Sequence, residues 1–207
     1  MRLYLVRHGE SEGNAVDVHQ FVHTPLSKAG IRQAKQLACR FESIEIDTIF
    51  ASDFTRTLQT AHEIASITKK EIITTPFLRE VRRPTEILGK NVNKPEVLAI
   101  KQKIKEHFED PQWHYADEEN FFDMKHRVSQ FLPFLESRSE KHILAVTHGV
   151  TMRMILGLII LGNNLKPKEF IQLAETLSVN NTGITVFEKK DEHPWRLLTW
   201  NDHAHLG

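Results

Sequence analysis

Residues Arg2–Asn14 read RLYLVRHGESEGN. The apolar run at positions 3–6 predicts a short buried strand, and the polar, glycine-containing residues that follow predict a loop. Arg7 and His8 therefore stand where this strand ends, so a guanidinium and an imidazole are expected at its carboxyl end. This order, a buried strand followed at once by ionisable side chains, guides the interpretation of the rest of the chain.

Three more strands are predicted from short apolar runs bounded by polar residues or proline. They are Asp47–Ala51, Glu71–Thr75 and Lys141–Thr147. The first of these leads into Ser52, and the last leads into His148 and Gly149. Two further strands therefore end, like the first strand of the chain, beside polar side chains.

Apolar residues at helical spacing predict helices between the strands. These helices are expected at 28–41, after a cap formed by Ser52-Asp53, at 121–135 with a kink at Pro133, and at 150–161. A terminal β-hairpin is predicted from Ile184–Glu188 and Trp195–Trp200. Because strands alternate with helices, the sequence predicts an α/β fold, a three-layer α/β/α sandwich with a mostly parallel sheet.

Residues 77–120 interrupt this alternation. They contain three prolines, mixed charge, no strand pattern and one predicted helix, at 95–108. We therefore expect a single domain of residues 1–207 in which a segment of about 77–120 forms an inserted lid.

The composition excludes several classes of protein. Among 207 residues, 27 Lys and Arg balance 27 Asp and Glu, so the chain lacks the basic surplus of a nucleic-acid binder. The single cysteine, Cys39, fits a reducing compartment, and no signal peptide is recognised at the start. The longest apolar run, Met154–Leu161, is too short to cross a bilayer. A cytoplasmic protein without nucleic-acid or membrane partners is expected, and whether it forms a homodimer is left open.

The polar strand ends are expected to meet. Ligands of open α/β sheets bind at the carboxyl ends of the parallel strands, where Arg7, His8 and His148 stand. Arg56 falls in the first turn of the helix after the second strand, and a cation there opposes the helix dipole unless an anion compensates it. Two guanidinium groups, two imidazoles and helix N-termini around one crevice predict a site for a phosphoryl dianion.

Blocks of residues resemble, in this order along the chain, the histidine phosphatase superfamily in its phosphoglycerate mutase-like branch. These blocks are 5–10 (LVRHGE), Asn14, 24–27 (TPLS), Gly30, Gln33-Ala34, 52–61 (SDFTRTLQTA), Glu80 and 146–149 (VTHG). The resemblance covers nearly the whole chain apart from the lid.

The resemblance implies a two-step phosphoryl transfer without a metal ion or any other cofactor. His8 is then the nucleophile that attacks phosphorus and becomes a transient phosphohistidine, with Arg7, Arg56 and His148 completing the catalytic set. Glu80 protonates the leaving oxygen and later deprotonates the attacking water. Contacts to the substrate are implied for Arg7, Asn14, Arg56, His148 and Gly149. A neutral imidazole is a competent nucleophile near pH 7, and fixed cations stabilise the charge on the transferred group.

Several assignments stay open at this stage. Glu71 and Glu86 are alternatives to Glu80 because they are predicted near the same strand end. His19 and His23 are spaced to hold a metal if helical, but their segment reads as a loop, and no metal site is predicted. Four basic residues of the lid either contact an anionic substrate or form a solvated face. These are Arg82, Arg83, Lys90 and Lys94.

The sequence therefore predicts a phosphomonoesterase that acts on a small phosphorylated metabolite, whose identity is left open. One alternative is a phosphoglycerate mutase, which is disfavoured because residues 81–84, VRRP, replace the Arg-aromatic-Gly segment that follows the acidic residue in that branch. The alternative from another class is a noncatalytic module that binds phosphorylated ligands. The presence of both His8 and Glu80 argues against it.

Overall fold

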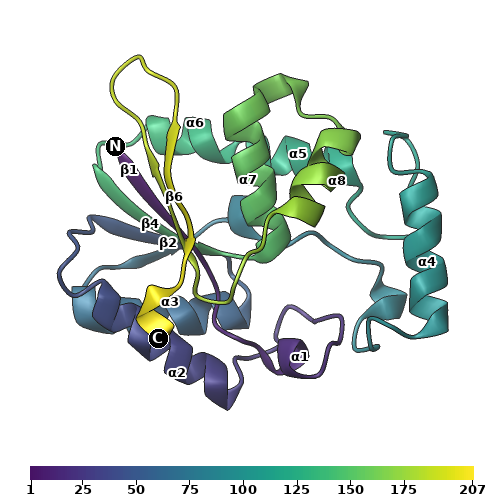
Figure 1. The fold of residues 1–207 in the computed structure, drawn as a ribbon, viewed down its shortest axis with the longest axis horizontal. Coiled ribbons are helices and arrows are strands. Elements are labelled where there is room, and N and C mark those ends of the chain that lie inside the picture. Colours follow the sequence, from purple (N-terminus) through teal and green to yellow (C-terminus); the bar gives the residue numbers. More distant parts are fainter.

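A computed structural model describes residues 1–207, and one six-stranded sheet runs through its centre (Figure 1). The strands are β1 (Arg2–Arg7), β2 (Thr48–Ala51), β3 (Ile72–Thr74), β4 (His142–Thr147), β5 (Ile184–Glu188) and β6 (Arg196–Asp202). Their order across the sheet is β3-β2-β4-β1-β5-β6. β1 to β4 are parallel, whereas β5 is antiparallel to β1 and β6 to β5. The predicted, mostly parallel sheet and the terminal hairpin are confirmed.

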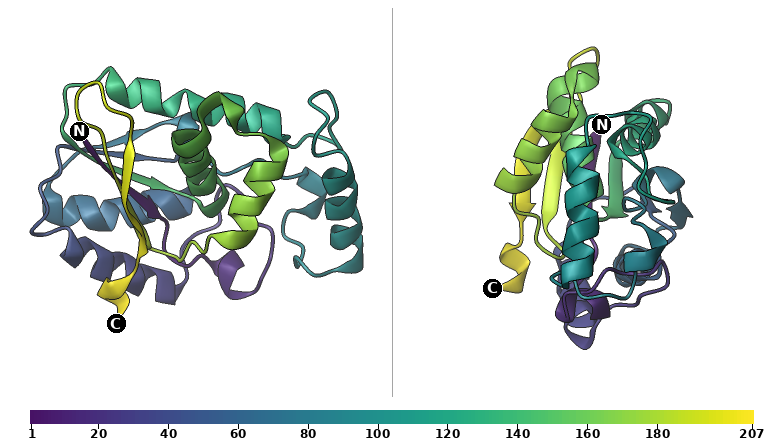
Figure 2. Two further views of the ribbon diagram at one scale, coloured as in Figure 1. Left: turned by 45° about the horizontal axis from the view of Figure 1, so that its top comes forward. Right: turned by 90° about the vertical axis from the view of Figure 1, so that its right-hand side faces the viewer.

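Helices cover both faces of the sheet, as the two views in Figure 2 show. They are α1 (Glu12–Ala15), α2 (Lys28–Arg40), α3 (Thr55–Thr68), α4 (Pro95–Glu106), α5 (Phe121–Ser129), α6 (Phe131–Glu136), α7 (Gly149–Leu161) and α8 (Pro167–Thr176). Short 3₁₀ turns lie at Pro76–Leu78 (η1), Thr85–Ile87 (η2), Gly162–Asn164 (η3) and Ala204–Leu206 (η4). No helix combines the length and the apolar composition that a membrane crossing requires.

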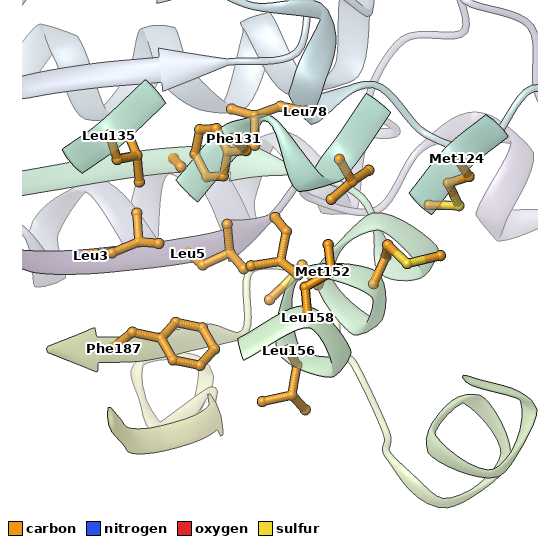
Figure 3. Close-up of a cluster of buried hydrophobic side chains, with 14 of the residues drawn as sticks. Leu3, Leu5, Leu78, Met124, Phe131, Leu135, Met152, Leu156, Leu158 and Phe187 are labelled. Atoms are coloured by element: carbon orange, nitrogen blue, oxygen red, sulfur yellow. The ribbon is translucent and has the colours of Figure 1, made fainter. Parts of the chain in front are cut away.

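The continuous apolar run of β1 is explained by burial on both faces of the sheet. Leu3 and Leu5 point into a core shared with α5, α6 and α7, where Phe131 and Phe187 lie close to them (Figure 3). Tyr4 and Val6 point into a second core, which α2 and α3 complete. Alternate residues of one strand thus hold both helical layers, and β1 cannot shift without disturbing each of them.

Three details differ from the sequence-based expectation. The helix predicted at 121–135 is divided into α5 and α6 at Gln130, because Pro133 has no N–H to donate to the carbonyl group one turn earlier. The Ser52-Asp53 pair does not cap α3. The N-cap is Phe54, with no side-chain capping bond, and the Ser52 hydroxyl accepts the Phe54 amide at 3.3 Å instead. The helices α1 and α8 were not predicted.

Residues 77–120, here called the cap segment, lie at the end of the molecule beyond the carboxyl ends of the strands. Figure 1 shows α4 there, well separated from the sheet. This segment contains the predicted helix as α4, and a small core of its own, formed by Ile87, Val97 and Ile100. The outer part of the cap segment thus has its own small core, whereas Leu78 at its beginning is buried in the large core beside the sheet.

Candidate active site

The backbone of the loop that follows β1 is held by hydrogen bonds to three different parts of the chain. The His8 amide donates to the Thr147 carbonyl of β4 at 3.0 Å, and the His8 carbonyl accepts from the Asn181 side chain at 2.9 Å. The Gly9 amide donates to the Thr60 hydroxyl of α3 at 3.1 Å. The position of His8 is therefore fixed by the sheet, by α3 and by the segment before β5.

Two glycines allow this loop to lie directly against α2. A Cβ atom on Gly30 would stand 1.8 Å from the Glu10 carbonyl oxygen, and one on Gly9 would stand 2.6 Å from the Gly30 carbonyl oxygen. Any side chain at either position would push the loop and the first turn of α2 apart. Steric constraints thus explain why glycine occupies positions 9 and 30 in the sequence blocks around His8.

The imidazole of His8 is only 3% exposed, and its hydrogen bonds define one tautomer. Its Nδ1 lies 2.6 Å from the Gly9 carbonyl oxygen, which can only accept, so Nδ1 carries the proton. Nε2 then has a free lone pair, to which the Arg56 Nε–H group donates at 3.3 Å. Burial, and then the charges of Arg56 and Arg7, lower the pKa of His8 well below 6.5, so the ring is neutral at pH 7.

The second imidazole lies beside the first. His148 is fully buried, and its ring packs against those of His8 and Phe54 with centroid separations of 5.1 and 5.0 Å. Its Nε2 is 3.0 Å from the Ser52 hydroxyl, whereas its buried Nδ1 has no partner. Burial, followed by the charge of Arg56, lowers the pKa of His148 well below 6.5. The sequence placed His148 against the ligand, but its side chain does not line the cavity described below.

Two guanidinium groups converge on these rings without a carboxylate partner. Arg56, 3% exposed in the first turn of α3, donates from Nη1 to the Phe21 carbonyl at 3.2 Å, and burial lowers its pKa to about 10. Arg7 donates from Nη1 to the Val179 carbonyl at 2.6 Å, while its buried Nε has no partner. Cations buried in this way destabilise the protein unless an anion joins them. Arg7 and Arg56 are therefore suited to bind an anion at the place where the sequence predicts an anion site.

Glu80 reaches the same cavity from the cap segment. Its carboxylate accepts the amides of Val150 and Thr151, each at 3.1 Å, in the first turn of α7. These bonds fix the carboxylate at a helix N-terminus, where a negative charge is favoured. The alternatives Glu71 and Glu86 are both exposed and neither lines the cavity.

The remaining predicted contacts occupy supporting positions. The Asn14 side-chain oxygen accepts the Ser11 amide at 3.2 Å within a capping box, which leaves the Asn14 amide nitrogen free beside the cavity. Gly149 opens α7 next to Arg7, whose Nε would be 3.6 Å from a Cβ atom at that position. Both residues thus lie within the group that the sequence indicated.

A cavity of about 660 Å³ unites these side chains. Its lining contains three carboxylates, from Asp53, Glu80 and Glu119, and six arginines. The arginines are Arg7, Arg56, Arg79, Arg82, Arg83 and Arg127. Two of them are neutralised, because Arg79 pairs with Asp53 and Arg127 with Glu119. The cavity is therefore cationic although the chain as a whole is neutral.

The other predicted candidates divide between the cavity and the surface. Of the four basic residues left open, Arg82 and Arg83 line the cavity, whereas Lys90 and Lys94 do not. His19 lines the cavity too, but His23 is exposed and stacks on Phe21. No group of three or more His, Cys, Asp or Glu side chains is arranged to hold a metal ion.

Three residues that position the site were given no role in it from the sequence. Ser52 contacts His148, Thr60 holds the Gly9 amide, and Asn181 holds the His8 carbonyl. Ser52 follows the end of β2, and polar residues at strand ends were the feature from which the site was predicted. Asn181 precedes β5, and because β5 is antiparallel to β1, its first residues lie at the same sheet edge as His8.

Comparisons with known proteins extend over this fold and site. The family model of the histidine phosphatase superfamily (branch 1) matches residues 3–203. A probable phosphoglycerate mutase GpmB from Proteus mirabilis is 45% identical over 82 residues, which are 39% of this chain and 38% of that protein. The match therefore spans well under half of either chain.

Solved structures match along the whole chain. Bacillus stearothermophilus YhfR has a TM-score of 0.82 at 24% identity, over 100% of this chain and 99% of the other. A phosphoserine phosphatase from Entamoeba histolytica, solved in complex with 3-phosphoglyceric acid, has a TM-score of 0.75 at 25% identity, over 99% and 98% of the two chains.

Proposed function

The chain belongs to branch 1 of the histidine phosphatase superfamily, and from this premise we propose that it is a phosphomonoesterase. Its substrate is a small phosphorylated metabolite, and the reaction passes through a phosphohistidine on His8. The observation that carries this proposal is the neutral His8 ring, whose Nε2 lone pair lies beside the unpaired guanidinium of Arg56.

In the first step, Nε2 of His8 attacks phosphorus, and the bond between phosphorus and the ester oxygen breaks. Arg56 donates to Nε2 in the free enzyme, so this N–H must turn to a phosphoryl oxygen before the lone pair can react. The incoming dianion supplies the stronger acceptor for that change. Glu80, held at α7, gives its proton to the departing oxygen.

The phosphoryl oxygens are stabilised by groups that the fold holds in place. Arg7 and Arg56 supply positive charge, and the free amide of Asn14 supplies a further donor. His148 does not line the cavity in the free protein, and its contact with the phosphoryl group, through the unpartnered Nδ1, requires that substrate enter beside His8. Such fixed donors and cations lower the barrier to phosphoryl transfer because they need no reorganisation during the reaction.

In the second step, water attacks the phosphohistidine, Glu80 accepts the proton of that water, and inorganic phosphate and free His8 are released. This cycle uses protein cations for charge stabilisation throughout. We therefore propose activity that is independent of added metal ions and, from the single cysteine, a reducing compartment such as the cytoplasm.

The direct test measures p-nitrophenyl phosphate hydrolysis in EDTA. Wild type should turn over, whereas His8→Ala should lose at least about 10⁴-fold in kcat, as is usual when a covalent nucleophile is removed. His23→Ala, at an exposed histidine outside the cavity, is the matched control. Acid-labile, base-stable phosphate should be trapped on wild type and not on His8→Ala. A protein that binds phosphate esters but hydrolyses none would instead be the noncatalytic module.

The similarity to a probable phosphoglycerate mutase keeps one second candidate in view. A mutase returns the phosphoryl group from His8 to the substrate instead of to water. Incubation with 3-phosphoglycerate, with and without a bisphosphoglycerate primer, separates the two activities. Efficient isomerisation with negligible phosphate release would overturn the phosphatase proposal.

A further inference from the structure

One arginine of the cavity is partly shielded from solvent and yet has no side-chain partner. Arg83 is partly buried and lines the cavity, but it forms neither a side-chain hydrogen bond nor an ion pair. The nearby carboxylate of Glu80 is engaged by the amides of α7. Neighbouring Arg82, by contrast, is exposed and lies within the field of carboxylates of the cap segment, such as Asp117.

A second side chain with an unused polar atom lies within the field of Arg83. His19 lines the same cavity, and its buried Nε2 has no hydrogen-bond partner. Burial, and then the charges of Arg83 and Lys101, lower the pKa of His19 to about 4, so its ring is neutral at pH 7. Lys101 approaches from α4, where its Nζ donates to the Val92 carbonyl at 3.2 Å.

This arrangement destabilises the free protein. Burying a guanidinium without a hydrogen-bonded carboxylate costs free energy, and the charge of Lys101 adds repulsion, which the field of Glu80 offsets only in part. The pKa of Lys101 is lowered by burial and by Arg83, so the two cations act on each other. The phosphoryl group would be held by Arg7 and Arg56, which leaves Arg83 without an ion-pair partner. Uncompensated groups of this kind are retained where a ligand completes them.

We propose that Arg83 and His19 form a distal anion subsite, which binds a second anionic group on the substrate. The proposal rests on the proposed function and narrows its substrate class to phosphate monoesters that also carry a carboxylate or a second phosphate. Arg83 binds this group as a charged fork, His19 donates one N–H, and Lys101 adds positive potential from α4. A second cavity, of about 630 Å³, also includes Arg83 in its lining, so the subsite lies where the two cavities meet.

Pairs of substrates that differ by one anionic group test the subsite. Phosphoserine is compared with phosphoethanolamine, and propane-1,3-diol bisphosphate with propyl phosphate. Wild type should favour the more anionic member of at least one pair by roughly 10- to 100-fold in kcat/KM, the range expected for hydrogen bonds to a charged group. Which pair responds distinguishes a carboxylate from a phosphate. Arg83→Gln should abolish this preference, whereas kcat/KM for p-nitrophenyl phosphate, which has no second anionic group, should change far less.

Matched variants exclude an indirect effect. Lys94→Gln removes the same charge from an exposed position of the cap segment outside both cavities, and it should keep the preference. Arg83→Gln should have an equal or higher Tm, because it removes a partly buried charge that has neither a hydrogen bond nor an ion pair. The proposal is overturned if wild type shows no preference, or if Arg83→Gln keeps it.

Binding to the inactive enzyme separates this proposal from the proposed function. With His8→Ala, calorimetry should find tighter binding of the more anionic ligand, and addition of Arg83→Gln should remove the difference. If wild type hydrolyses no ester, the proposed function fails while this comparison still decides the subsite. Equal binding of both ligands to His8→Ala would overturn the subsite even if the phosphatase activity is established.

Discussion

The carboxyl edge of the sheet and the cap segment contribute to one cavity in different ways. At the sheet edge, His8 and His148 are 3% and 0% exposed, and the amides of His8 and Gly9 are held by β4 and α3. The cap segment supplies Glu80, Arg82 and Arg83 from loops between short turns. A rigid edge suits atoms that must meet at bonding distance, whereas loops vary more freely and suit selection of the substrate.

Glu80 joins the two regions, and its replacement should have the largest effect. Glu80→Gln keeps the size of the side chain but removes the proton that the leaving oxygen needs, so kcat for alkyl phosphates should fall by about 10²- to 10⁴-fold. The loss should be much smaller for p-nitrophenyl phosphate, whose leaving group departs without a proton. Steady-state kinetics with both substrates measure this difference.

Glu86→Gln is the matched control, because that carboxylate is exposed in the cap segment and accepts from the Tyr115 hydroxyl instead of from α7. It should leave kcat unchanged for both substrates. Equal losses in Glu80→Gln for both leaving groups would mean that Glu80 orients the site instead of transferring the proton.

Arg127 should have the next largest effect, on stability. Its ion pair with Glu119 is well covered, with side-chain exposures of 17% and 14%, and its Nη1 also donates to three carbonyl groups, of residues 76, 77 and 79. Arg127→Met keeps the aliphatic stem but strands the Glu119 carboxylate. Urea denaturation should show a free energy of unfolding lower by about 2–4 kcal/mol.

The double variant Arg127→Met, Glu119→Gln should recover part of that loss, because no unpaired charge then remains. If the single variant loses less than about 0.5 kcal/mol, the Arg127–Glu119 pair contributes little to holding the cap segment to the sheet edge.

Each region was predictable from the sequence to a different extent, and the reason is physical. β1 is buried on both faces, so positions 3–6 form a continuous apolar run, and the edge geometry of parallel strands then brings Arg7 and His8 to His148. In the cap segment, only α4 has a periodic pattern. The positions of the Arg82 and Arg83 side chains depend on loop conformation, which no periodicity encodes, and so their roles stayed open. Asn181 was missed for the same reason.

The two buried histidines should make stability depend on pH below 6.5. Because their pKa values are lowered in the folded protein, the rings stay neutral there, while unfolded chains take up protons below about pH 6.5. Unfolding therefore binds protons, and the free energy of unfolding should fall with acidification by up to about 1.4 kcal/mol per pH unit for each histidine. Urea titrations between pH 7 and 5.5 measure this slope.

His148→Gln retains a donor or acceptor for Ser52 and removes one of these titrations. In His148→Gln, the free energy of unfolding should change less steeply with pH, by the contribution of one histidine. The slope of His62→Gln, which alters an exposed position, should equal that of wild type. Identical slopes in wild type and His148→Gln would show that the ring is not held neutral in the folded state.

Arg79 should have the smallest effect of the four. It pairs with Asp53 between the cap segment and the loop after β2, but the two side chains are 46% and 36% exposed. Arg79→Ala should therefore lower the free energy of unfolding by no more than about 0.2–1 kcal/mol, and added salt should reduce the difference. A loss as large as that in Arg127→Met would show that exposed and covered pairs hold the cap segment equally.

The arginine-lined cavity has a consequence for how substrate arrives. A chain without net charge that gathers an excess of arginines around one cavity must carry its excess of carboxylates elsewhere, and so it has an electric dipole moment. Small anions are then guided toward the cavity mouth by the field instead of meeting it by undirected diffusion. The association rate of a phosphate ester should accordingly fall as ionic strength rises, although the net charge of the protein is zero.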